Sequence, residues 1–221
     1  MKRIFLNMKI YQIYGKRVFD LSAALLGIVF LSPFFLFIAF LIKFEDQGPV
    51  FFIQKRIGKN GKLFDIYKFR SMSYNPWINN FFTPGDKSRI TKIGKFLRKY
   101  KIDELPELMN IIKGEMSFVG PRPEVIPYFD FYRKEPFNDI LYLRPGITDW
   151  ASIKYRSEEE LLGRAKNPDK LYREKILPKK LNLNLLYSRN IRLKTDLKII
   201  FITLFKVVAP GVNSYQWGIE G

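Results

Sequence analysis

The sequence predicts an α+β protein, in which a small and mostly helical cytoplasmic domain with a β-hairpin is fused to an N-terminal re-entrant membrane helix. Three observations support this prediction. Residues 18–42 form one long apolar run, residues 50–70 alternate like two strands joined by a tight turn, and residues 87–101 combine a helical apolar period with many basic residues. We therefore expect residues 1–42 to form a basic N-terminus with the membrane helix, and residues 43–221 to form the cytoplasmic domain.

The apolar run of residues 18–42 is long enough to cross a membrane, because a straight helix of this length rises roughly 37 Å against a hydrocarbon core of about 30 Å. Its length, and the lack of a small-residue cleavage site after it, exclude a secretory signal peptide. Pro33 lacks an N–H and bends a helix, and Ser32 can satisfy the backbone carbonyl that the bend frees. Basic residues, which favour the cytoplasmic side, flank both ends of the run: Lys2, Arg3, Lys9, Lys16, Arg17, Lys43, Lys55, Arg56 and Lys59. The sequence therefore favours a re-entrant helix broken at Ser32-Pro33, with a kinked single span as the alternative.

The charge of the chain predicts a polyanionic partner. The chain has 38 Lys and Arg against 21 Asp and Glu, a formal net charge of +17, so nucleic acid, anionic lipid and phosphorylated substrates all fit. Its 21 phenylalanines suit a lipid interface better, so we expect membrane lipid and no nucleic acid as partners. The absence of Cys and His excludes disulfides, Cys or His metal sites and every His-dependent triad. Chemistry must then depend on carboxylates, Lys, Arg, Tyr and a hard metal ion.

The elements after the apolar run follow in order along the chain. Asn60-Gly61 supplies the positive φ angles of the hairpin turn, and residues 73–85 read as a loop rich in Asn and Pro. Residues 87–101 predict a basic amphipathic helix at an anionic membrane surface, with an ordinary surface helix as the alternative. Residues 197–208 are too short to span a membrane and predict a core helix or an interfacial one.

Asp103-Glu104-Leu105-Pro106 precedes a short predicted helix over residues 107–112, which Gly114 ends. Pro106 is tolerated only in the first turn, which places Asp103 at the helix start as an N-cap. Backbone N–H groups and the helix dipole would hold the Asp103 carboxylate ionised there, and the same N–H groups favour a phosphate. An ordinary capping Asp with a chance Glu neighbour is the alternative.

Two prolines frame one arginine in Gly120-Pro121-Arg122-Pro123, and Arg144-Pro145-Gly146 repeats the arrangement. A guanidinium held by a rigid turn suits bidentate phosphate contact, although an arginine in a turn is more often only solvated. The chain has no G-x-x-x-x-G-K-[ST] loop, no G-x-G-x-x-G motif and no D-x-D pair. Phosphate charge must therefore meet arginines and helix N-termini, and a Mg²⁺ held by carboxylate oxygens is a further candidate.

Seven motifs occur in a fixed order: Lys16-Arg17-Val18-Phe19-Asp20, Ser32-Pro33, Lys68-Phe69-Arg70-Ser71-Met72, Asp103-Glu104-Leu105-Pro106, Lys113-Gly114-Glu115-Met116-Ser117, Gly120-Pro121-Arg122-Pro123 and Arg144-Pro145-Gly146-Ile147-Thr148. This series resembles the bacterial sugar transferase family, the monotopic phosphoglycosyl transferases that start glycan assembly on undecaprenyl phosphate. The resemblance covers about residues 15–150, with a looser echo at Asp196-Leu197-Lys198-Ile199-Ile200. The chain looks like the minimal form of the family, without additional N-terminal membrane helices.

The resemblance implies a phosphoglycosyl transferase at the cytoplasmic face of the bacterial inner membrane, with residues 43–221 as its catalytic domain. The implied reaction moves a sugar 1-phosphate from a UDP-sugar to undecaprenyl phosphate with Mg²⁺. It is the first membrane step in the assembly of a capsule, O-antigen, exopolysaccharide or glycoprotein. By match to the family motif, Asp103 is the nucleophile that forms an aspartyl-phosphosugar and releases UMP. Glu104 is implied to be a metal ligand together with Asp103, or an acid–base group. The implied substrate-binding residues are Arg122, its neighbours Pro121 and Pro123, and further candidates Lys68, Arg70 and Arg144.

One departure from the family concerns Asp149, because the family usually continues Pro-Gly-Ile-Thr with Gly. Glycine would allow a positive φ or a close backbone approach that Asp149 does not. Residues 157–190 also match poorly, and the sequence indicates neither the sugar nor the glycan pathway nor the oligomeric state.

Two other functions fit the sequence. A glycosyltransferase would transfer the sugar without its phosphate and yield UDP. A non-enzymatic basic scaffold at the membrane surface, such as a degenerate relative, would not need the carboxylates. The intact Asp103-Glu104 pair and the turn around Arg122 favour an enzyme over the scaffold.

Overall fold

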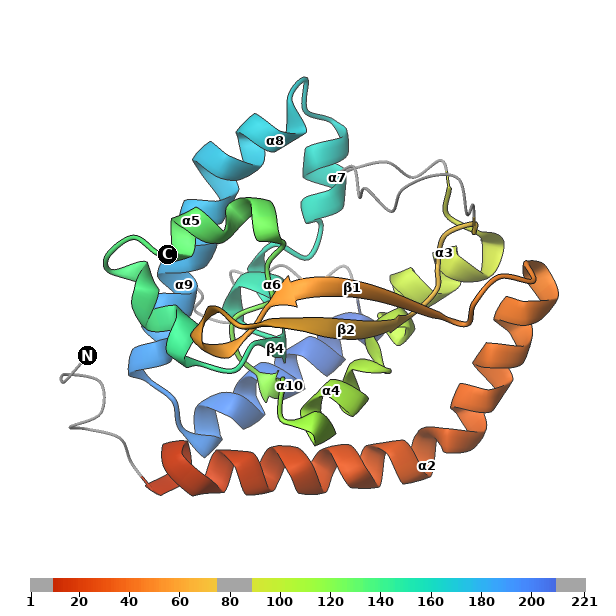
Figure 1. Cartoon of the computed structure of the whole chain (residues 1–221), viewed down its shortest axis with the longest axis horizontal. Helices are drawn as coiled ribbons and strands as arrows, with labels where there is room; N and C mark the ends of the chain where they lie inside the picture. The colour runs from red at the N-terminus through yellow and green to blue at the C-terminus, as the bar shows by residue number, and fades with distance from the viewer. Residues whose placement is uncertain (1–9, 75–88, 210–221) are drawn as a thin grey trace.

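The N-terminal apolar run forms α2 (Lys16–Glu45), which follows a short π-helical turn (Tyr11–Gly15). The computed structural model describes residues 10–74 and 89–209. Within this part of the chain, α2 is the one helix whose length and composition would allow it to cross a membrane. Figure 1 shows that α2 runs along one edge of the molecule and that its C-terminal part bends and continues along the adjacent edge.

Pro33 lies inside α2 and interrupts its hydrogen bonding at one place. Because proline has no N–H, the carbonyl of Val29, four residues earlier, has no backbone donor. Ser32 Oγ donates a hydrogen bond to this carbonyl at 2.9 Å, which confirms the predicted role of Ser32. The predicted break at Ser32-Pro33 is thus a bend within one continuous helix.

The predicted hairpin is confirmed as β1 (Phe51–Ile57) and β2 (Leu63–Phe69), which pair antiparallel from Phe51 opposite Phe69 to Ile57 opposite Leu63. Asn60 and Gly61 have φ angles of 58° and 73°, as expected for this turn. The inner face of β2 packs against α2 and α4 (Glu107–Lys113) through a buried apolar cluster. This cluster contains Ala24, Phe64, Ile66, Leu108, Ile111 and Met116.

The predicted basic helix is shorter than expected. It is α3 (Lys92–Lys99), and Thr91 caps it by accepting a hydrogen bond from the N–H of Gly94 at 2.9 Å. The cap fixes the start of the helix, so Ile90 lies instead in an isolated antiparallel bridge with Met72. Most of the loop predicted over residues 73–85 lies outside the described residues.

The chain between α3 and β4 (Gly146–Thr148) builds the centre of the fold. A 3₁₀ turn (Ile102–Glu104) leads into α4, which ends at Gly114 with φ 83°, as predicted. The short strand β3 (Ser117–Val119) then pairs in parallel with β4.

The remaining helices cover this centre on one side, as Figure 1 shows. They are α5 (Phe129–Tyr132), α6 (Trp150–Lys154), α7 (Glu158–Gly163), α8 (Pro168–Leu171), α9 (Leu177–Arg189) and α10 (Leu193–Val208), with 3₁₀ turns at Ile126–Tyr128 and Phe137–Tyr142 and a π-helical turn at Tyr172–Ile176. The expected α+β class with mostly helical structure is confirmed.

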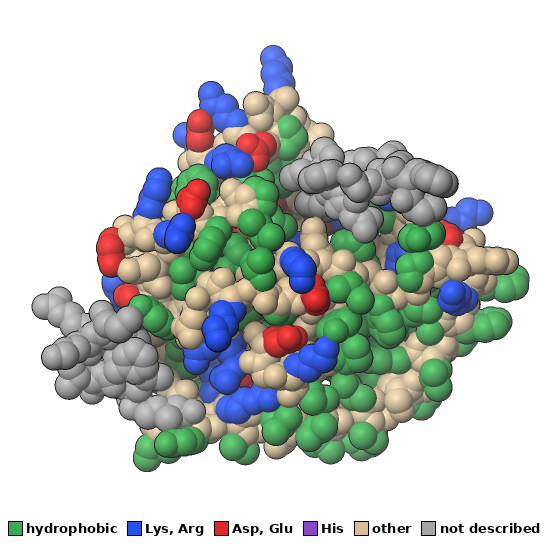
Figure 2. Space-filling model, viewed as in Figure 1, with side chains coloured by type: hydrophobic (Ala, Val, Ile, Leu, Met, Phe, Trp, Pro, Cys, Tyr) green, Lys and Arg blue, Asp and Glu red, His purple; other side chains and the backbone are tan. Residues whose placement is uncertain are grey.

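α10 has two apolar faces. Ile199 and Ile202 are fully buried in the core with β3 and α9, whereas Phe201 and Leu204 are exposed on the other face. The prediction of a core helix is therefore confirmed for one face. Exposed apolar side chains also follow α2, and Figure 2 shows them gathered along the edge that α2 forms.

Candidate functional site

Three acidic residues come together where the 3₁₀ turn passes into α4. Asp103 and Glu104 lie in the turn, Glu107 lies in the first turn of α4, and all three are buried. Leu105 and Pro106 between them also have helical backbone angles, so residues three and four positions apart share one face. We call Asp103, Glu104 and Glu107 the carboxylate cluster.

Three basic side chains meet Glu104 from different elements. Arg122 forms an ion pair with Oε1 and also donates to Oε2 at 3.3 Å, Lys68 of β2 donates to Oε1 at 3.1 Å, and Lys101 lies 3.7 Å from Oε1. Burial alone would raise the pKa of Glu104, but Arg122, then Lys68 and Lys101, hold it well below its usual range. Glu104 is therefore an ionised carboxylate with both oxygens engaged. We call Lys68, Lys101 and Arg122 the cation group.

Asp103 differs from its neighbour because its buried Oδ1 has no hydrogen-bond partner. Burial raises the pKa of Asp103, the adjacent charge of Glu104 raises it further, and Lys68 and Lys101 oppose the shift. A buried acceptor oxygen without a donor is costly unless another group completes it. Asp103 thus presents an unsatisfied oxygen beside several cations.

The predicted N-cap role of Asp103 is wrong. The helical conformation begins at Ile102, before the proline, so Asp103 lies inside the 3₁₀ turn. Pro106 occupies the cap position of α4, and no side chain caps that helix. Burial and the charge of Glu104 raise the pKa of Asp103, and the positive charges of Lys68 and Lys101, not backbone N–H groups, oppose that shift.

Glu107 is a site residue that the sequence analysis missed. Its side chain is 1% exposed, and its Oε1 lies 3.2 Å from the same Lys68 Nζ that pairs with Glu104. Burial raises the pKa of Glu107 to about 7, although Lys68 opposes the shift. The spacing Asp103-Glu104-x-x-Glu107 was the signal that could have found it, because a continuous helical turn places these positions on one face.

The turn around Arg122 is fixed by Asp149, the second residue whose role the sequence did not reveal. One carboxylate oxygen of Asp149 accepts the backbone N–H of Arg122 at 3.1 Å, and the other caps α6 by accepting the N–H of Ser152 at 2.5 Å. Asp149 is fully buried, and its φ of −158° is extended backbone that suits any residue. Asp149 therefore needs no positive φ, and the signal for its role was its place three residues before Ser152 at a helix start.

The same turn depends on a close approach of two glycines. The N–H of Gly120 donates to Thr148 O at 3.0 Å, and the N–H of Gly146 donates to Pro121 O at 2.9 Å. The backbone hydrogen bonding between the β3 and β4 segments therefore continues into the turn. A Cβ at Gly146 would collide with the backbone of Gly120, and a Cβ at Gly120 would collide with the carbonyl oxygen of Arg144. Pro121 and Pro123 fix the backbone on both sides of Arg122.

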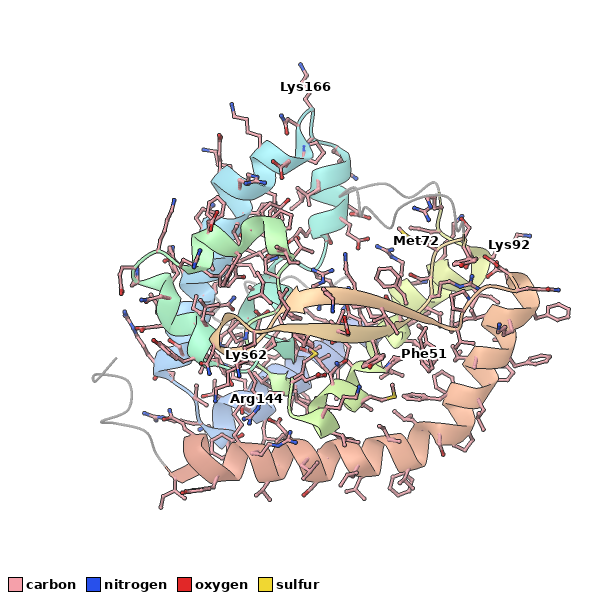
Figure 3. All side chains as sticks on the ribbon, in the orientation of Figure 1. Phe51, Lys62, Met72, Lys92, Arg144 and Lys166 are labelled. Carbon is pink, nitrogen blue, oxygen red and sulfur yellow. The ribbon has the colours of Figure 1, made fainter. Side chains whose placement is uncertain are left out.

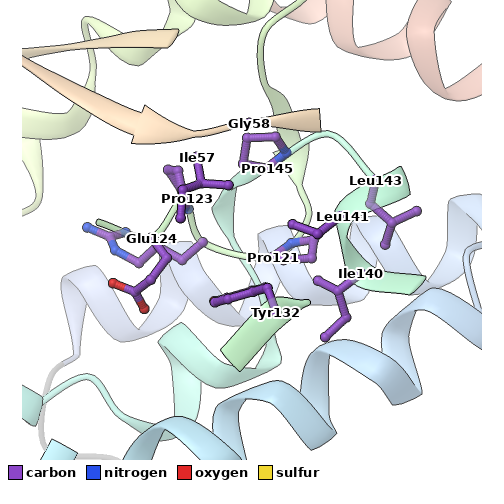
Figure 4. Close-up of a pocket in the computed structure, with 11 residues that line it drawn as sticks. Ile57, Gly58, Pro121, Pro123, Glu124, Tyr132, Ile140, Leu141, Leu143 and Pro145 are labelled. Carbon is purple, nitrogen blue, oxygen red and sulfur yellow. The ribbon is translucent and has the colours of Figure 1, made fainter. Parts of the chain in front are cut away.

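A small pocket borders this turn, as Figure 4 shows. Its lining includes Arg122 and Glu124 together with apolar side chains of the hairpin end and of the segment before β4. Glu124 accepts a hydrogen bond from the hydroxyl of Tyr172 at 2.5 Å. The carboxylate cluster does not line this pocket, so the pocket lies beside the site and not over Asp103.

Arg70 and Arg144 make their contacts elsewhere. Arg70 donates to the backbone carbonyl of Asp46 at 2.7 Å and pairs with its carboxylate at 3.2 Å, just after α2. Arg144 donates to the carbonyl of Gly114 at 2.9 Å at the end of α4, and Figure 3 shows it between the hairpin and α2. Of the predicted substrate-binding side chains, Lys68 and Arg122 are therefore the two that join the carboxylates.

The residues present fit Mg²⁺ through Asp103 better than through Glu104. Mg²⁺ is commonly held by one or two carboxylates together with substrate phosphates and water. The unsatisfied Oδ1 of Asp103 can serve as such a ligand, whereas both oxygens of Glu104 are engaged by cations. In the described part of the chain, no group of three or more acidic residues has an arrangement that would hold a metal by itself.

Comparison with known proteins gives one family. The sequence model of bacterial sugar transferases matches residues 11–210. A UDP-N-acetylgalactosamine-undecaprenyl-phosphate N-acetylgalactosaminephosphotransferase of Aeromonas hydrophila is 46% identical over 142 residues, which cover 62% of this chain and 33% of that protein. A UDP-glucose:undecaprenyl-phosphate glucose-1-phosphate transferase of Escherichia coli is 36% identical over 196 residues, which cover 86% of this chain and 39% of that protein.

The chain thus matches less than half the length of these two relatives. An uncharacterized sugar transferase of Bacillus subtilis is similar over nearly its whole length, with 36% identity over 199 residues that cover 90% of each chain. The family match includes α2, the carboxylate cluster, the turn around Arg122 and α10. The chain therefore belongs to the bacterial sugar transferase family.

Proposed function

We propose that this protein transfers a sugar 1-phosphate from a UDP-sugar to undecaprenyl phosphate and releases UMP, as the first membrane step of bacterial glycan assembly. The observation that carries this proposal is the buried Oδ1 of Asp103, which, like the two oxygens of Glu107, lacks a hydrogen-bond partner, and which lies beside Lys68 and Lys101. An oxygen in this state is available for attack on phosphorus, and the chain has no His that could activate another nucleophile. The names of the Aeromonas and Escherichia relatives, which act with UDP-sugars and undecaprenyl phosphate, support the choice of substrates.

The proposed reaction has two displacements at one phosphorus. In the first, an oxygen of the Asp103 carboxylate attacks the β-phosphorus of the donor, a new carboxylate–phosphorus bond forms, and the bond to the bridging oxygen breaks. The electron pair of that bond leaves with UMP. In the second, a phosphate oxygen of undecaprenyl phosphate attacks the same phosphorus, and the bond to Asp103 breaks, which restores the carboxylate. The product is undecaprenyl diphosphate carrying the sugar.

The charge of the site supports a donor that arrives with a divalent cation. All three members of the cation group already pair with carboxylates of the site: Lys68, Lys101 and Arg122 with Glu104, and Lys68 also with Glu107. A free diphosphate would add negative charge beside Asp103 and oppose its ionisation. Mg²⁺ bound with the diphosphate would neutralise the phosphate charge that builds up during transfer. Asp103 is the residue of this chain that we expect to reach the ion.

Glu104 and Arg122 would position the donor. The two oxygens of Glu104 contact the two terminal nitrogens of the Arg122 guanidinium, so the orientation of this group is fixed before the donor binds. Lys68 bridges Glu104 and Glu107 and keeps positive charge at the base of the site. In this proposal Arg122 and Lys68 stabilise the phosphates. Glu104 orients these two basic side chains and is not the first ligand of the metal ion.

The acceptor lipid places the reaction at a membrane, and we propose that α2 enters and leaves it on the cytoplasmic face. The bend at Pro33, the exposed apolar side chains of α2 and the basic residues on both flanks support this path. With both ends of α2 on one side, the carboxylate cluster would lie where the isoprenoid phosphate meets the cytoplasm.

The experiment that tests the covalent step uses a panel of UDP-sugars without acceptor and reads the mass of the intact protein. We expect one donor to add the mass of one sugar phosphate, on Asp103, in wild type and in Asp65→Asn. Asp65 is a matched control, because it is a partly exposed carboxylate of the hairpin that pairs with Lys55 at 3.2 Å. Asp103→Asn should remain unmodified. Release of UMP only after acceptor is added, with no adduct at any donor concentration, would contradict the aspartyl intermediate.

A further inference from the structure

Lys101 has a backbone conformation that is unusual for its residue type. Its φ is 57°, and Asn60, with φ 58°, is the one other non-glycine residue with a positive φ in the part of the chain that the structure describes. Asn tolerates this region because of its short polar side chain, whereas for Lys the Cβ crowds the following carbonyl. The strain at residue 101 therefore needs an explanation.

The path of the chain does not require a lysine at this position. Lys101 follows the end of α3, and its N–H donates to Arg98 O at 3.3 Å. At the end of α4 the residue with a positive φ is a glycine, Gly114, with φ 83°. Glycine is the common choice there because it adopts a positive φ without strain. A glycine at position 101 would end α3 equally well.

The helix dipole does not explain the lysine either. A cation near the C-terminus of a helix is stabilising, but α3 already carries Arg98 and Lys99 in its last turn. The Lys101 ammonium is directed to a carboxylate, since its Nζ lies 3.7 Å from Glu104 Oε1.

Within the cation group, Lys101 is the member that can most easily change its partner. Its side chain is 42% exposed, compared with 16% for Lys68 and 31% for Arg122. Its distance to Glu104 is also longer than the 3.1 Å of Lys68. If Lys101 turns away, Glu104 still has Lys68 and Arg122, so no buried charge is left without a partner.

We propose that Lys101 is a substrate-binding residue whose ammonium leaves Glu104 to pair with a diphosphate oxygen of the donor beside Asp103. This inference rests on the proposed function and adds a contact to the same site. The left-handed backbone holds the start of the side chain at the edge of the carboxylate cluster, between α3 and the 3₁₀ turn that carries Asp103. The backbone strain at Lys101 thus serves to place its ammonium beside the carboxylate cluster, and the fold itself does not need it.

The test exploits the opposite effects that Lys101→Gly should have on stability and on binding. The variant relieves the strain, so its unfolding temperature should be unchanged or higher than that of wild type. Loss of one charge-assisted contact should weaken binding of UDP in the presence of Mg²⁺, and raise the KM for the donor, by about 10-fold. Lys101→Arg should restore most of this loss, because it keeps the charge.

Asn60→Gly is the matched control. It changes the other non-glycine residue with a positive φ, which lies in the hairpin turn, and should leave UDP affinity and KM as in wild type. Equal UDP affinity in wild type and Lys101→Gly would overturn the proposal, and so would a loss that Lys101→Arg fails to restore. A wild-type protein that binds UDP but releases no UMP from any donor would count against the proposed function alone, and the binding comparison would still decide the role of Lys101.

Discussion

The carboxylate of Asp149 accepts the backbone N–H of Arg122 at 3.1 Å and so joins the start of α6 to the turn that carries the proposed phosphate-binding arginine. The neighbours of Arg122 are both proline, so its own N–H is the donor through which this part of the turn can be held. The second oxygen of Asp149 caps α6 through Ser152. One buried side chain therefore couples helix capping to the position of Arg122.

Asp149→Asn should reduce both stability and catalysis, because an amide has one acceptor oxygen for two N–H donors. We expect the free energy of unfolding to fall by about 1–2 kcal/mol and kcat/KM to fall by about 10-fold as Arg122 loses its fixed position. In an Arg122→Ala background, the stability loss should persist while the additional loss of activity disappears. Thermal unfolding and steady-state nucleotide release measure the two effects.

Asn167→Ala is the control for this prediction, since Asn167 caps α8 by accepting the N–H of Lys170 at 3.0 Å. It should lower stability without changing kcat/KM. An Asp149→Asn variant with normal activity, or one whose activity loss is the same with and without Arg122, would show that Asp149 acts only as a cap.

The raised pKa of Glu107 predicts that the stability of the protein depends on pH. Burial raises its folded-state pKa to about 7, while in the unfolded chain it titrates near its ordinary value of 4.5. Between these values the folded protein binds more protons than the unfolded chain, so the contribution of Glu107 to stability is full below about pH 4.5 and is lost as the pH rises through about 7.

Glu107→Gln removes this titration, and its stability relative to wild type should rise across the same window by about 1–3 kcal/mol. Chemical unfolding at several pH values measures the difference. The charged groups that act on Glu107 include Lys68, Glu104, Arg122 and Arg56, and all four remain in the variant. A difference that stays constant from pH 4 to 8 would contradict the assignment.

The path of α2 can be tested by labelling single cysteines, because the chain has no native cysteine. Ile10 and Gln47 are exposed on either side of α2. In inside-out vesicles, both Ile10→Cys and Gln47→Cys should react with a membrane-impermeant maleimide, and in right-side-out vesicles neither should. Reaction of one position from each side would establish the kinked single span.

The elements that the sequence predicted correctly depend on local chemistry. Asn60-Gly61 and Gly114 determine a turn and a helix end through their own backbone preferences. Ser32 is next to Pro33, so its hydroxyl reaches the carbonyl that Pro33 leaves without a donor. The predicted N-cap position of Asp103 is wrong because the helical backbone begins at Ile102 and not at Pro106.

The partners of charged residues could not be predicted, because they come from distant parts of the chain. Lys68 and Arg70 lie in one motif, yet Lys68 reaches Glu107 while Arg70 is bound by Asp46. The family resemblance implied substrate contact for both. The tertiary packing of the end of β2 against α2 and α4 decides which of them belongs to the site. The sequence likewise showed only that Asp149 stands where the family usually has glycine, because its two hydrogen-bond partners are visible only in the structure.

The identity of the nucleotide that is released from UDP-sugars in the presence of undecaprenyl phosphate and Mg²⁺ decides whether this protein transfers a sugar phosphate through Asp103. Wild type should release UMP from at least one donor, and Asp103→Asn, which has similar size but cannot form the acyl phosphate, should release none. Release of UDP would contradict phosphosugar transfer, and UMP release at the wild-type rate by Asp103→Asn would contradict the role of Asp103 as nucleophile.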